Sequence, residues 1–457
     1  MREIFAARQE YISLLGAQPV EPGRVYRMLD FCLQTNVEGE MVLCNTLTGE
    51  ILALTAEEAA ALQELPGRLS LEIEPLVAKW FLVPTEHDDI DLCDNLRGLL
   101  RDMTPPKPIT DFTIFTTTDC NARCFYCYEM GRSRVPMTET VARDVAAYIL
   151  RVHGNQKVKL FWFGGEPLYN AGVIDIICTA LRDAGVSYTS RMISNGYLLD
   201  DAMIEKAKSL WNLYQVQITL DGLEEVYNRV KAYIYKDKES AFRIVTTHID
   251  HLLQREICVV VRMNLGKHNK EELYRLVDWL AERYAGNPYL QAYAHLLFET
   301  DKERDKDELS HKRADEAQAF LEFTQYCEEK GLLRVAKNTV SLKLNHCMMD
   351  SATSVTILPD GHVGKCEHFS EDGFVGDIYS GITDHAQMAM FRESINCKEV
   401  CAGCPVYPYC IKPKYCPNEN HYTCDAAKRL IEETTLRRRV EATYRAAKKK
   451  AAEKSAE

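Results

Sequence analysis

The sequence Cys120-Asn-Ala-Arg-Cys124-Phe-Tyr-Cys127 has a C-x₃-C-x₂-C spacing and follows the apolar, β-branched run Phe112–Thr118. That run predicts a β-strand, so the cysteines fall on the loop that leaves its carboxyl end. Three thiolates so close in sequence can bind three irons of a [4Fe–4S] cube and leave the fourth iron open to a small chelating ligand. Zinc is compatible with the spacing too, but a structural zinc site normally has a fourth Cys or His, and the next histidine is His153.

Length and charge limit the class of protein. The chain has 457 residues, too many for one compact domain, so two or three domains are expected. Its net charge of −12 argues against non-specific binding to nucleic acid or to an anionic membrane. No apolar run approaches the roughly 18 residues of a membrane span, and the amino terminus lacks the apolar segment of a signal peptide. We therefore expect a cytoplasmic protein.

The chain contains 17 cysteines, which in a reducing compartment indicate metal or cluster ligands rather than disulfides. Most of them fall into two spaced groups. The others stand singly, and most of these are expected to be small buried apolar residues: Cys32, Cys44, Cys93, Cys178, Cys258 and Cys327.

Residues 108–310 alternate between strand and helix patterns. Strands are predicted over 112–117, 157–163, 188–193, 216–220 and 258–264, with helices over 138–153, 170–184 and 200–211. Apolar strands between helices predict an α/β domain with a parallel sheet that is covered by helices. In such folds the functional site lies at the carboxyl ends of the strands.

Short polar motifs stand at these predicted strand ends, although each by itself is an ordinary turn or surface sequence. Two adjacent glycines give a backbone that a ligand can approach closely. The motifs are Gly164-Gly165-Glu166-Pro167, Ser194-Asn195-Gly196, Thr219-Leu220-Asp221-Gly222 and the pair Arg262 and Asn264.

At these residues the sequence resembles the radical S-adenosylmethionine (SAM) superfamily, whose cysteine loop carries an aromatic residue where Tyr126 stands. The resemblance implies a partial (β/α)6 barrel whose open iron binds SAM. It also implies reductive cleavage to a 5′-deoxyadenosyl radical, with electrons from a one-electron donor such as flavodoxin or ferredoxin.

The resemblance also implies the SAM contacts. The motif Gly164-Gly165-Glu166 would meet the SAM ammonium, and Ser194 with Asn195 would lie near the ribose. Thr219 is a further contact, and Arg262 or Asn264 would meet the SAM carboxylate, with a surface role as the alternative. Lys231 stands where similar enzymes have an arginine, so this chain offers a point charge in place of a planar fork.

Residues 1–105 predict strands over 28–34 and 41–54, then a capping box at Thr55-Ala-Glu-Glu58 that opens a helix to about residue 65. A second helix from Ser70 to about residue 80 and a short strand over 81–84 complete a winged-helix-like module. It is either a stabilising extension or a peptide-docking domain, because an exposed edge strand can pair with an extended peptide. The module resembles the leader-peptide recognition element of peptide-modifying enzymes. The acidic run Glu86–Asp94 and Pro105-Pro106 are expected to form a linker.

Residues 345–430 hold the second group of cysteines: Cys347, Cys366, Cys397, Cys401, Cys404, Cys410, Cys416 and Cys424. This region resembles the SPASM domain, which holds two auxiliary [4Fe–4S] clusters, although the x₅ interval after Cys410 is longer than usual. The resemblance implies one cube on Cys401, Cys404, Cys410 and Cys424. The other would lie on Cys347, Cys366 and Cys416, with Cys397 or an open iron at its fourth corner. The alternative is one or two zinc ribbons.

Glu367 follows Cys366 directly, at the place of a proposed general base in the similar anaerobic sulfatase-maturing enzymes, which have aspartate there. Residues 311–344 are expected to form a helical linker, and residues 431–457 a charged helical tail.

Together these resemblances imply a maturase that takes a hydrogen atom from a ribosomally made precursor peptide with a leader and forms an intrapeptide crosslink, a Cys sulfur-to-carbon thioether. Three alternatives stay open: a formylglycine-forming sulfatase maturase, a maturase that forms a carbon–carbon bond, and a non-enzymatic cluster or zinc protein.

Overall fold

The computed structural model describes the chain except residues 128, 130, 236–238, 267–268, 298–305, 338–339, 369–372, 395–397, 412, 417–423, 425 and 457. Among the described residues, no helix combines the length and the apolar character that crossing a membrane requires.

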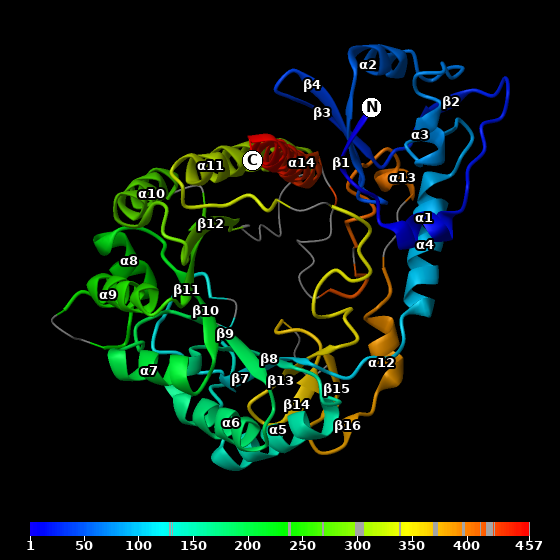
Figure 1. Ribbon diagram of the computed structural model, residues 1–457. Coiled ribbons are helices and arrows are strands. Elements are labelled where there is room, and N and C mark those ends of the chain that lie inside the picture. Colours follow the sequence, from blue (N-terminus) through cyan, green and yellow to red (C-terminus); the bar gives the residue numbers. More distant parts are fainter. Residues whose placement is uncertain are drawn as a thin grey trace.

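Six parallel strands in chain order form the centre of the molecule. They are β7 (Asp111–Thr117), β8 (Val158–Gly164), β9 (Tyr188–Ser194), β10 (Leu213–Thr219), β11 (Cys258–Leu265) and β12 (Leu290–Leu296). The predicted parallel α/β sheet is thus confirmed, and β12 adds a strand that the sequence patterns did not single out. The intervening helices lie on the convex side of the curved sheet (Figure 1): α5 (Glu139–Val152), α6 (Ala171–Asp183), α7 (Asp201–Ser209), α8 (Glu224–Lys231), α9 (Ala241–Gln254) and α10 (Lys270–Tyr284).

Alternation along the strands decides which side the helices cover. In β8, Val158, Leu160 and Trp162 are completely buried under the helices, whereas Lys159 on the opposite side is exposed. Helices α5 and α7 begin where Thr138 and Asp200 accept hydrogen bonds from backbone N–H groups of the first turn. This winding brings the carboxyl ends of all six strands to one edge of the sheet.

The C-terminal region continues the same sheet. Strand β13 (Ser354–Ile357) pairs in parallel with β7, and β14 (His362–Gly364), β15 (Phe374–Asp377) and β16 (Gly381–Ile382) follow as antiparallel strands. Strand β13 thus lies between β14, which precedes Cys366, and β7, which precedes the first cysteine loop.

The N-terminal region contains a four-stranded antiparallel sheet in the order β1 (Arg2–Phe5), β5 (Ile51–Leu54), β4 (Glu40–Asn45) and β3 (Cys32–Val37). A small second sheet pairs β2 (Tyr26–Met28) with β6 (Leu82–Pro84). The capping box at Thr55 and Glu58 is confirmed as the start of α2 (Ala56–Gln63). The helix predicted after Ser70 is only α3 (Pro75–Ala78), and α1 (Gln9–Leu15) precedes the sheet.

The acidic run Glu86–Asp94 is not a linker, and that prediction was wrong. Asp88 caps the helix α4 (Asp89–Met103), whose acidic first turn suits the positive end of the helix dipole. Ile90, Leu96 and Leu100 lie on one side of α4 and are buried. The charges that suggested a solvated linker belong to the start of an amphipathic helix.

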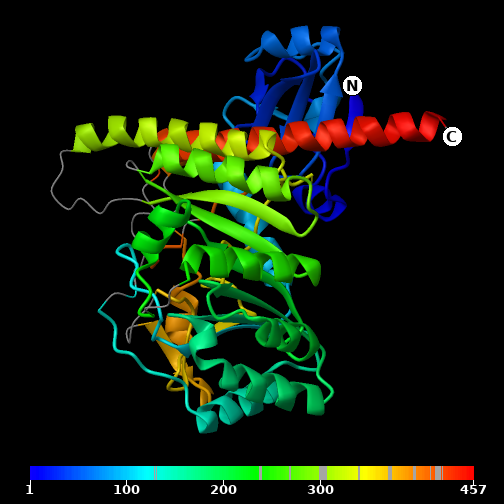
Figure 2. The same ribbon diagram turned by 90° about the vertical axis from the view of Figure 1, so that its left-hand side faces the viewer.

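Helix α14 (Ala426–Ala456) begins before the predicted tail and packs on the N-terminal sheet. Its Leu436, Val440 and Tyr444 are buried in one apolar cluster with Leu33 and Val37 of β3. Helix α11 (Lys306–Glu329), in the region expected to link the domains, runs beside α14 (Figure 2). The remaining short helices are η1 (Pro167–Asn170), α12 (His385–Met390) and α13 (Lys398–Cys401).

Candidate functional site

The first cysteine loop leaves the end of β7, and its three thiols lie within electrostatic reach of one another. The Cys120 sulfur accepts hydrogen bonds from the backbone N–H of Ala122 at 3.3 Å and from Asn195 Nδ2 at 3.8 Å. Burial, followed by the negative charges of Glu166, Cys124 and Cys127, raises the pKa of the Cys120 thiol to about 12. The neighbouring thiols thus interact electrostatically with Cys120.

These donors fit an iron–sulfur cube. Cysteine thiolates are its ligands, and N–H groups that point at the sulfurs tune its potential. A structural zinc ion instead needs ligands that converge on one point at about 2.0–2.3 Å. Nowhere in the described ranges do three or more His, Cys, Asp or Glu side chains come together so that they could hold a single metal ion.

Glu166 joins the ends of β8 and β9. Its buried carboxylate accepts hydrogen bonds from the Ser194 hydroxyl at 2.9 Å and from the backbone N–H groups of Leu168 at 3.1 Å and Asn195 at 2.7 Å. Burial raises the pKa of Glu166 to about 7 although these hydrogen bonds lower it. The Glu166 carboxyl therefore lies where a ligand cation would strongly favour its ionised form.

Close backbone packing accounts for the two glycines before Glu166. A Cβ at Gly164 would lie 2.1 Å from the carbonyl oxygen of Thr117, and one at Gly165 would lie 2.3 Å from that of Asp119. The end of β8 thus packs closely against the backbone that leads into the cysteine loop. The end of β9 contacts the same loop, because Asn195 Nδ2 donates to Asn121 Oδ1 at 2.6 Å.

Tyr126 is held from the other side by a buried ion pair. Its hydroxyl donates to Asp221, and Lys231 Nζ donates to the Tyr126 oxygen at 2.8 Å and lies 3.1 Å from Asp221 Oδ2. Asn264 Nδ2 donates to Asp221 Oδ1 at 2.9 Å. Burial lowers the pKa of Lys231, but the negative charges of Asp221, Tyr126 and Cys124 together outweigh it and leave that pKa well above its usual value.

Several predicted site residues therefore come together around one loop, namely Tyr126, Glu166, Ser194, Asn195 and Lys231. Thr219 and Arg262 are direct neighbours across β10 and β11, and Arg262 Nε donates to Asn264 Oδ1 at 3.0 Å. The sequence did not identify Asp221 as the residue that pairs with Tyr126 and Lys231. Its place at the end of β10, beside Thr219, was the available signal.

Glu367 lies beside the segment that follows the cysteine loop. Arg132 donates to the backbone carbonyls of Glu367 at 3.5 Å and His368 at 3.4 Å. Burial lowers the pKa of His368, and the charges of Arg132 and Arg262 lower it further, although the neighbouring Glu367 raises it.

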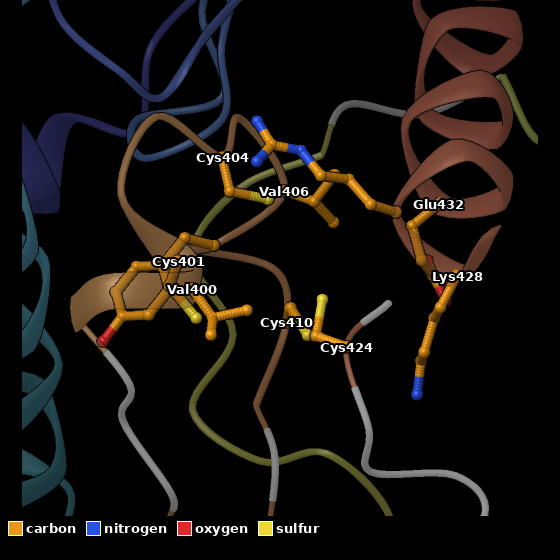
Figure 3. A pocket seen from close by; sticks show the side chains of 10 residues that line it. Val400, Cys401, Cys404, Val406, Cys410, Cys424, Lys428 and Glu432 are labelled. Atoms are coloured by element: carbon orange, nitrogen blue, oxygen red, sulfur yellow. The ribbon is translucent and has the colours of Figure 1, made fainter. Parts of the chain in front are cut away.

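Four C-terminal cysteines line one pocket: Cys401, Cys404, Cys410 and Cys424. Figure 3 shows their sulfurs with Lys428 and Glu432 from α14 at the pocket wall. Arg429 also lines the pocket, and it donates to the carbonyl of Gly403 at 2.6 Å.

A second set of thiols includes Cys366, which comes just after β14. After burial, the charges of Cys347 and Cys416 are among the causes that raise the pKa of Cys366, and Cys416 acts likewise on Cys347. These three are the residues that the resemblance assigned to the other cube. Cys397, its proposed fourth ligand, lies outside the described residues.

Comparisons with known proteins agree with this arrangement. Residues 114–280 match the family described as the Radical SAM superfamily. A probable GTP 3′,8-cyclase of Thermococcus kodakarensis is 22% identical over 315 residues, which cover 64% of this chain and 96% of that protein. A dTDP-4-amino-4,6-dideoxy-D-glucose ammonia-lyase of Streptomyces venezuelae is 25% identical over 235 residues, 47% of this chain and 44% of that enzyme.

Among solved structures, hexahistidine-tagged anSMEcpe with bound AdoMet superposes with a TM-score of 0.55 at 14% identity, over 74% of this chain and 99% of that one. Native anSMEcpe with bound AdoMet and the Cp18Cys peptide gives 0.53 at 14% identity, over 76% and 100%. At such identities the likeness shows the fold. Fold, cysteine loop and family match therefore agree on one conclusion: residues 114–280 of this chain form a radical SAM domain.

Proposed function

We propose that this enzyme matures a ribosomally made peptide by joining a cysteine sulfur to a carbon of the same peptide. The observation that carries the proposal is the presence of two further groups of thiols in the C-terminal region, one that lines a pocket and one that includes Cys366 just after β14. A hydrogen-atom transfer leaves one electron to be removed, and auxiliary clusters at these thiols would accept it.

The hydrogens and electrons that the reaction removes indicate what SAM, the base and the auxiliary clusters would each do. Forming a C–S bond from a C–H and an S–H group removes two hydrogens from the peptide. One leaves as an atom to the 5′-deoxyadenosyl radical, which SAM and the first cluster supply when bound. The other leaves as a proton to a base and an electron to an auxiliary cluster, so the product is lighter by two hydrogens.

The chain's own residues would hold SAM. Glu166, at the junction of β8 and β9, is the proposed partner of the SAM ammonium, with Gly164 and Gly165 fixing its backbone. Ser194 and Asn195 would lie by the ribose. Thr219 and Arg262, neighbours at the ends of β10 and β11, are the proposed contacts of its carboxylate side.

Tyr126 and Lys231 contact each other and Asp221. Their proposed role is therefore to hold one side of the SAM-binding site in place. Glu367 is the proposed base for the thiol proton, since the turn that carries it lies against Arg132, just after the first cysteine loop.

The N-terminal sheet offers one edge for a leader peptide. Helix α14 covers the β3 edge of this sheet. Its Arg437 donates to the carbonyl of Gln34, and its Lys448 pairs with Glu38 at 2.6 Å. Strand β1 at the opposite edge is mostly exposed. We therefore place an extended leader along β1, where it would add a strand.

The test is an anaerobic reaction with a short cysteine-bearing peptide that is encoded beside this gene. We expect 5′-deoxyadenosine and a product that has lost two hydrogens per link, with the crosslink located by fragmentation. An unchanged peptide mass would reject the proposal. A crosslink in a substrate without cysteine would indicate carbon–carbon bond formation, and formylglycine would indicate a sulfatase maturase.

A nucleotide substrate is a second candidate, because a relative named as a probable GTP 3′,8-cyclase is matched over 96% of its length. Incubation with GTP, SAM and a reductant distinguishes the two. Consumption of GTP with release of 5′-deoxyadenosine would favour this candidate.

A further inference from the structure

Helix α4 of the N-terminal region carries a buried arginine that faces the C-terminal cysteine segments. Arg97 is only 4% exposed. Its guanidinium donates from Nη1 to Asp94 Oδ1 at 2.8 Å, and this ion pair compensates the buried charge. Its Nη2 also donates to the Cys93 sulfur of the same helix at 3.6 Å, and Nη2 and Nε have further acceptors outside α4.

Those donors reach two segments that are far apart in sequence. Arg97 Nη2 lies 3.5 Å from the carbonyl oxygen of Tyr407 and 3.3 Å from that of Pro408, between Cys404 and Cys410. Arg97 Nε donates to the carbonyl of Lys343 at 3.2 Å. One guanidinium thus fixes a cysteine loop of the pocket and the chain that leads to Cys347.

Arg101, one turn further along α4, extends this contact. Its guanidinium donates to the carbonyl of Leu344 at 2.6 and 3.1 Å, three residues before Cys347. The two segments also bind each other, since the Lys343 N–H donates to the Pro408 carbonyl at 3.0 Å. Both cysteine groups therefore connect to the same face of α4.

The rest of the N-terminal region supports the same loop. The Gly403 N–H donates to Asp30 at 2.9 Å, and the Thr46 hydroxyl donates to the Pro405 carbonyl at 2.6 Å. The ring of Tyr407, which lines the pocket, stacks on Phe31 at 5.6 Å, and its hydroxyl donates to Asp94 at 2.9 Å.

We propose that Arg97 is a positioning residue for both C-terminal cysteine groups, so that the N-terminal region is a structural part of the auxiliary-cluster housing as well as a docking module. The proposal rests on the proposed ligand role of these cysteines. Lysine cannot replace Arg97, because an ammonium has three donors on one atom and cannot reach three carbonyls and Asp94 together.

The experiment compares Arg97→Lys and Arg97→Met with wild type and with Arg334→Lys. Arg334 is an exposed control that also donates to two successive carbonyls, those of Asn287 at 2.7 Å and Pro288 at 3.2 Å, away from any proposed ligand. Iron and sulfide per chain are measured after anaerobic reconstitution, with low-temperature electron paramagnetic resonance of the reduced protein with and without SAM.

We expect both Arg97 variants to lose about four to eight of roughly twelve irons, which is one or two cubes. The signal that SAM perturbs should persist in them, and Arg334→Lys should match wild type. Unchanged iron content and unchanged auxiliary signals in a folded Arg97→Met protein would overturn the proposal. Loss of all three signals together would also overturn it, because the role would then be general stability.

Alkylation of the cluster-free protein separates this inference from the proposed function. If Arg97 positions the loops, Cys404, Cys410 and Cys347 should react about tenfold faster in Arg97→Lys than in wild type, since lost hydrogen bonds favour local opening. Cys120 should react at the wild-type rate. Equal rates at all four thiols would overturn the positioning role. Wild type with only about four irons but the expected alkylation pattern would refute the auxiliary clusters and retain Arg97.

Discussion

The two cysteine sites are built in opposite ways. The radical SAM loop takes its thiols from residues 120–127, at the end of one strand. The C-terminal pocket takes its thiols from residues 401–424, and its wall includes the start of α14. Only the first arrangement is a local property of the sequence.

The residues that hold each cysteine site in place also differ in how far they lie from it in the sequence. Neighbouring strand ends of one sheet hold the first loop, through Asn195 and through Asp221 with Lys231. The second depends on α4 and on the N-terminal sheet, more than 300 residues away, through Arg97 and Thr46. The two sites should therefore fail independently, and four predictions test this.

The largest effect is expected from replacing Cys120, Cys124 and Cys127 by alanine. Deoxyadenosine formation should be abolished, while about eight of roughly twelve irons stay bound, because the C-terminal thiols do not depend on this loop. Iron analysis and chromatography of the nucleoside measure both. Cys258→Ser, a half-buried cysteine outside both groups, is the control. Loss of every iron would show that the sites are coupled.

Breaking the buried ion pair comes next. Lys231→Met leaves the Asp221 carboxylate buried without its cation, which should cost about 3–5 kcal/mol of unfolding free energy. Urea unfolding measures it, and Asp221→Asn in the same protein should recover part of the loss. Arg143→Met removes an exposed helix pair with Glu139 and should cost at most about 0.5 kcal/mol. Equal effects of the two single changes would contradict the prediction.

The raised pKa of Glu166 predicts that the unfolding free energy of the SAM-free protein depends on pH. Burial raises its pKa to about 7, from an ordinary value of 4.5, so the folded chain keeps a proton that the unfolded chain has lost. Its contribution to stability is full below pH 4.5 and is lost as the pH rises through 7, by about 3 kcal/mol in total.

Glu166→Gln should remove this part of the slope, whatever constant offset it adds, because an amide does not titrate. Urea unfolding at pH 5, 6, 7 and 8 measures the difference between variant and wild type. Parallel curves would refute the raised pKa.

The smallest effect is expected at the cap of α4. Asp88 accepts a hydrogen bond from the Asp91 N–H at 3.0 Å, and Asp88→Ala should cost about 1 kcal/mol. The thermal midpoint should fall slightly, and iron content should stay at the wild-type value, since the cap lies more than two turns from Arg97. A loss of auxiliary signals would show that even the start of α4 controls the pocket.

Much of the central domain could be predicted from the sequence. The strands predicted over residues 112–117, 157–163 and 188–193 are confirmed, because short apolar runs that alternate with helices are typical of a buried parallel sheet. The prediction of a linker at Glu86–Asp94 was wrong because the acidic residues at the start of a helix have the composition of a solvated stretch. Only the packing of Leu96 and Leu100 in the N-terminal apolar cluster shows that the segment is an amphipathic helix.

The sequence by itself determined the first cysteine loop and the polar residues at the strand ends, because spacing within a loop and alternation along a strand are local. Tertiary structure alone decided that Asp221 pairs with Lys231, that α14 covers the N-terminal sheet, and that Arg97 holds both C-terminal cysteine segments. Such contacts join residues tens to hundreds of positions apart, and no local periodicity or spacing specifies which distant partner satisfies a buried charge.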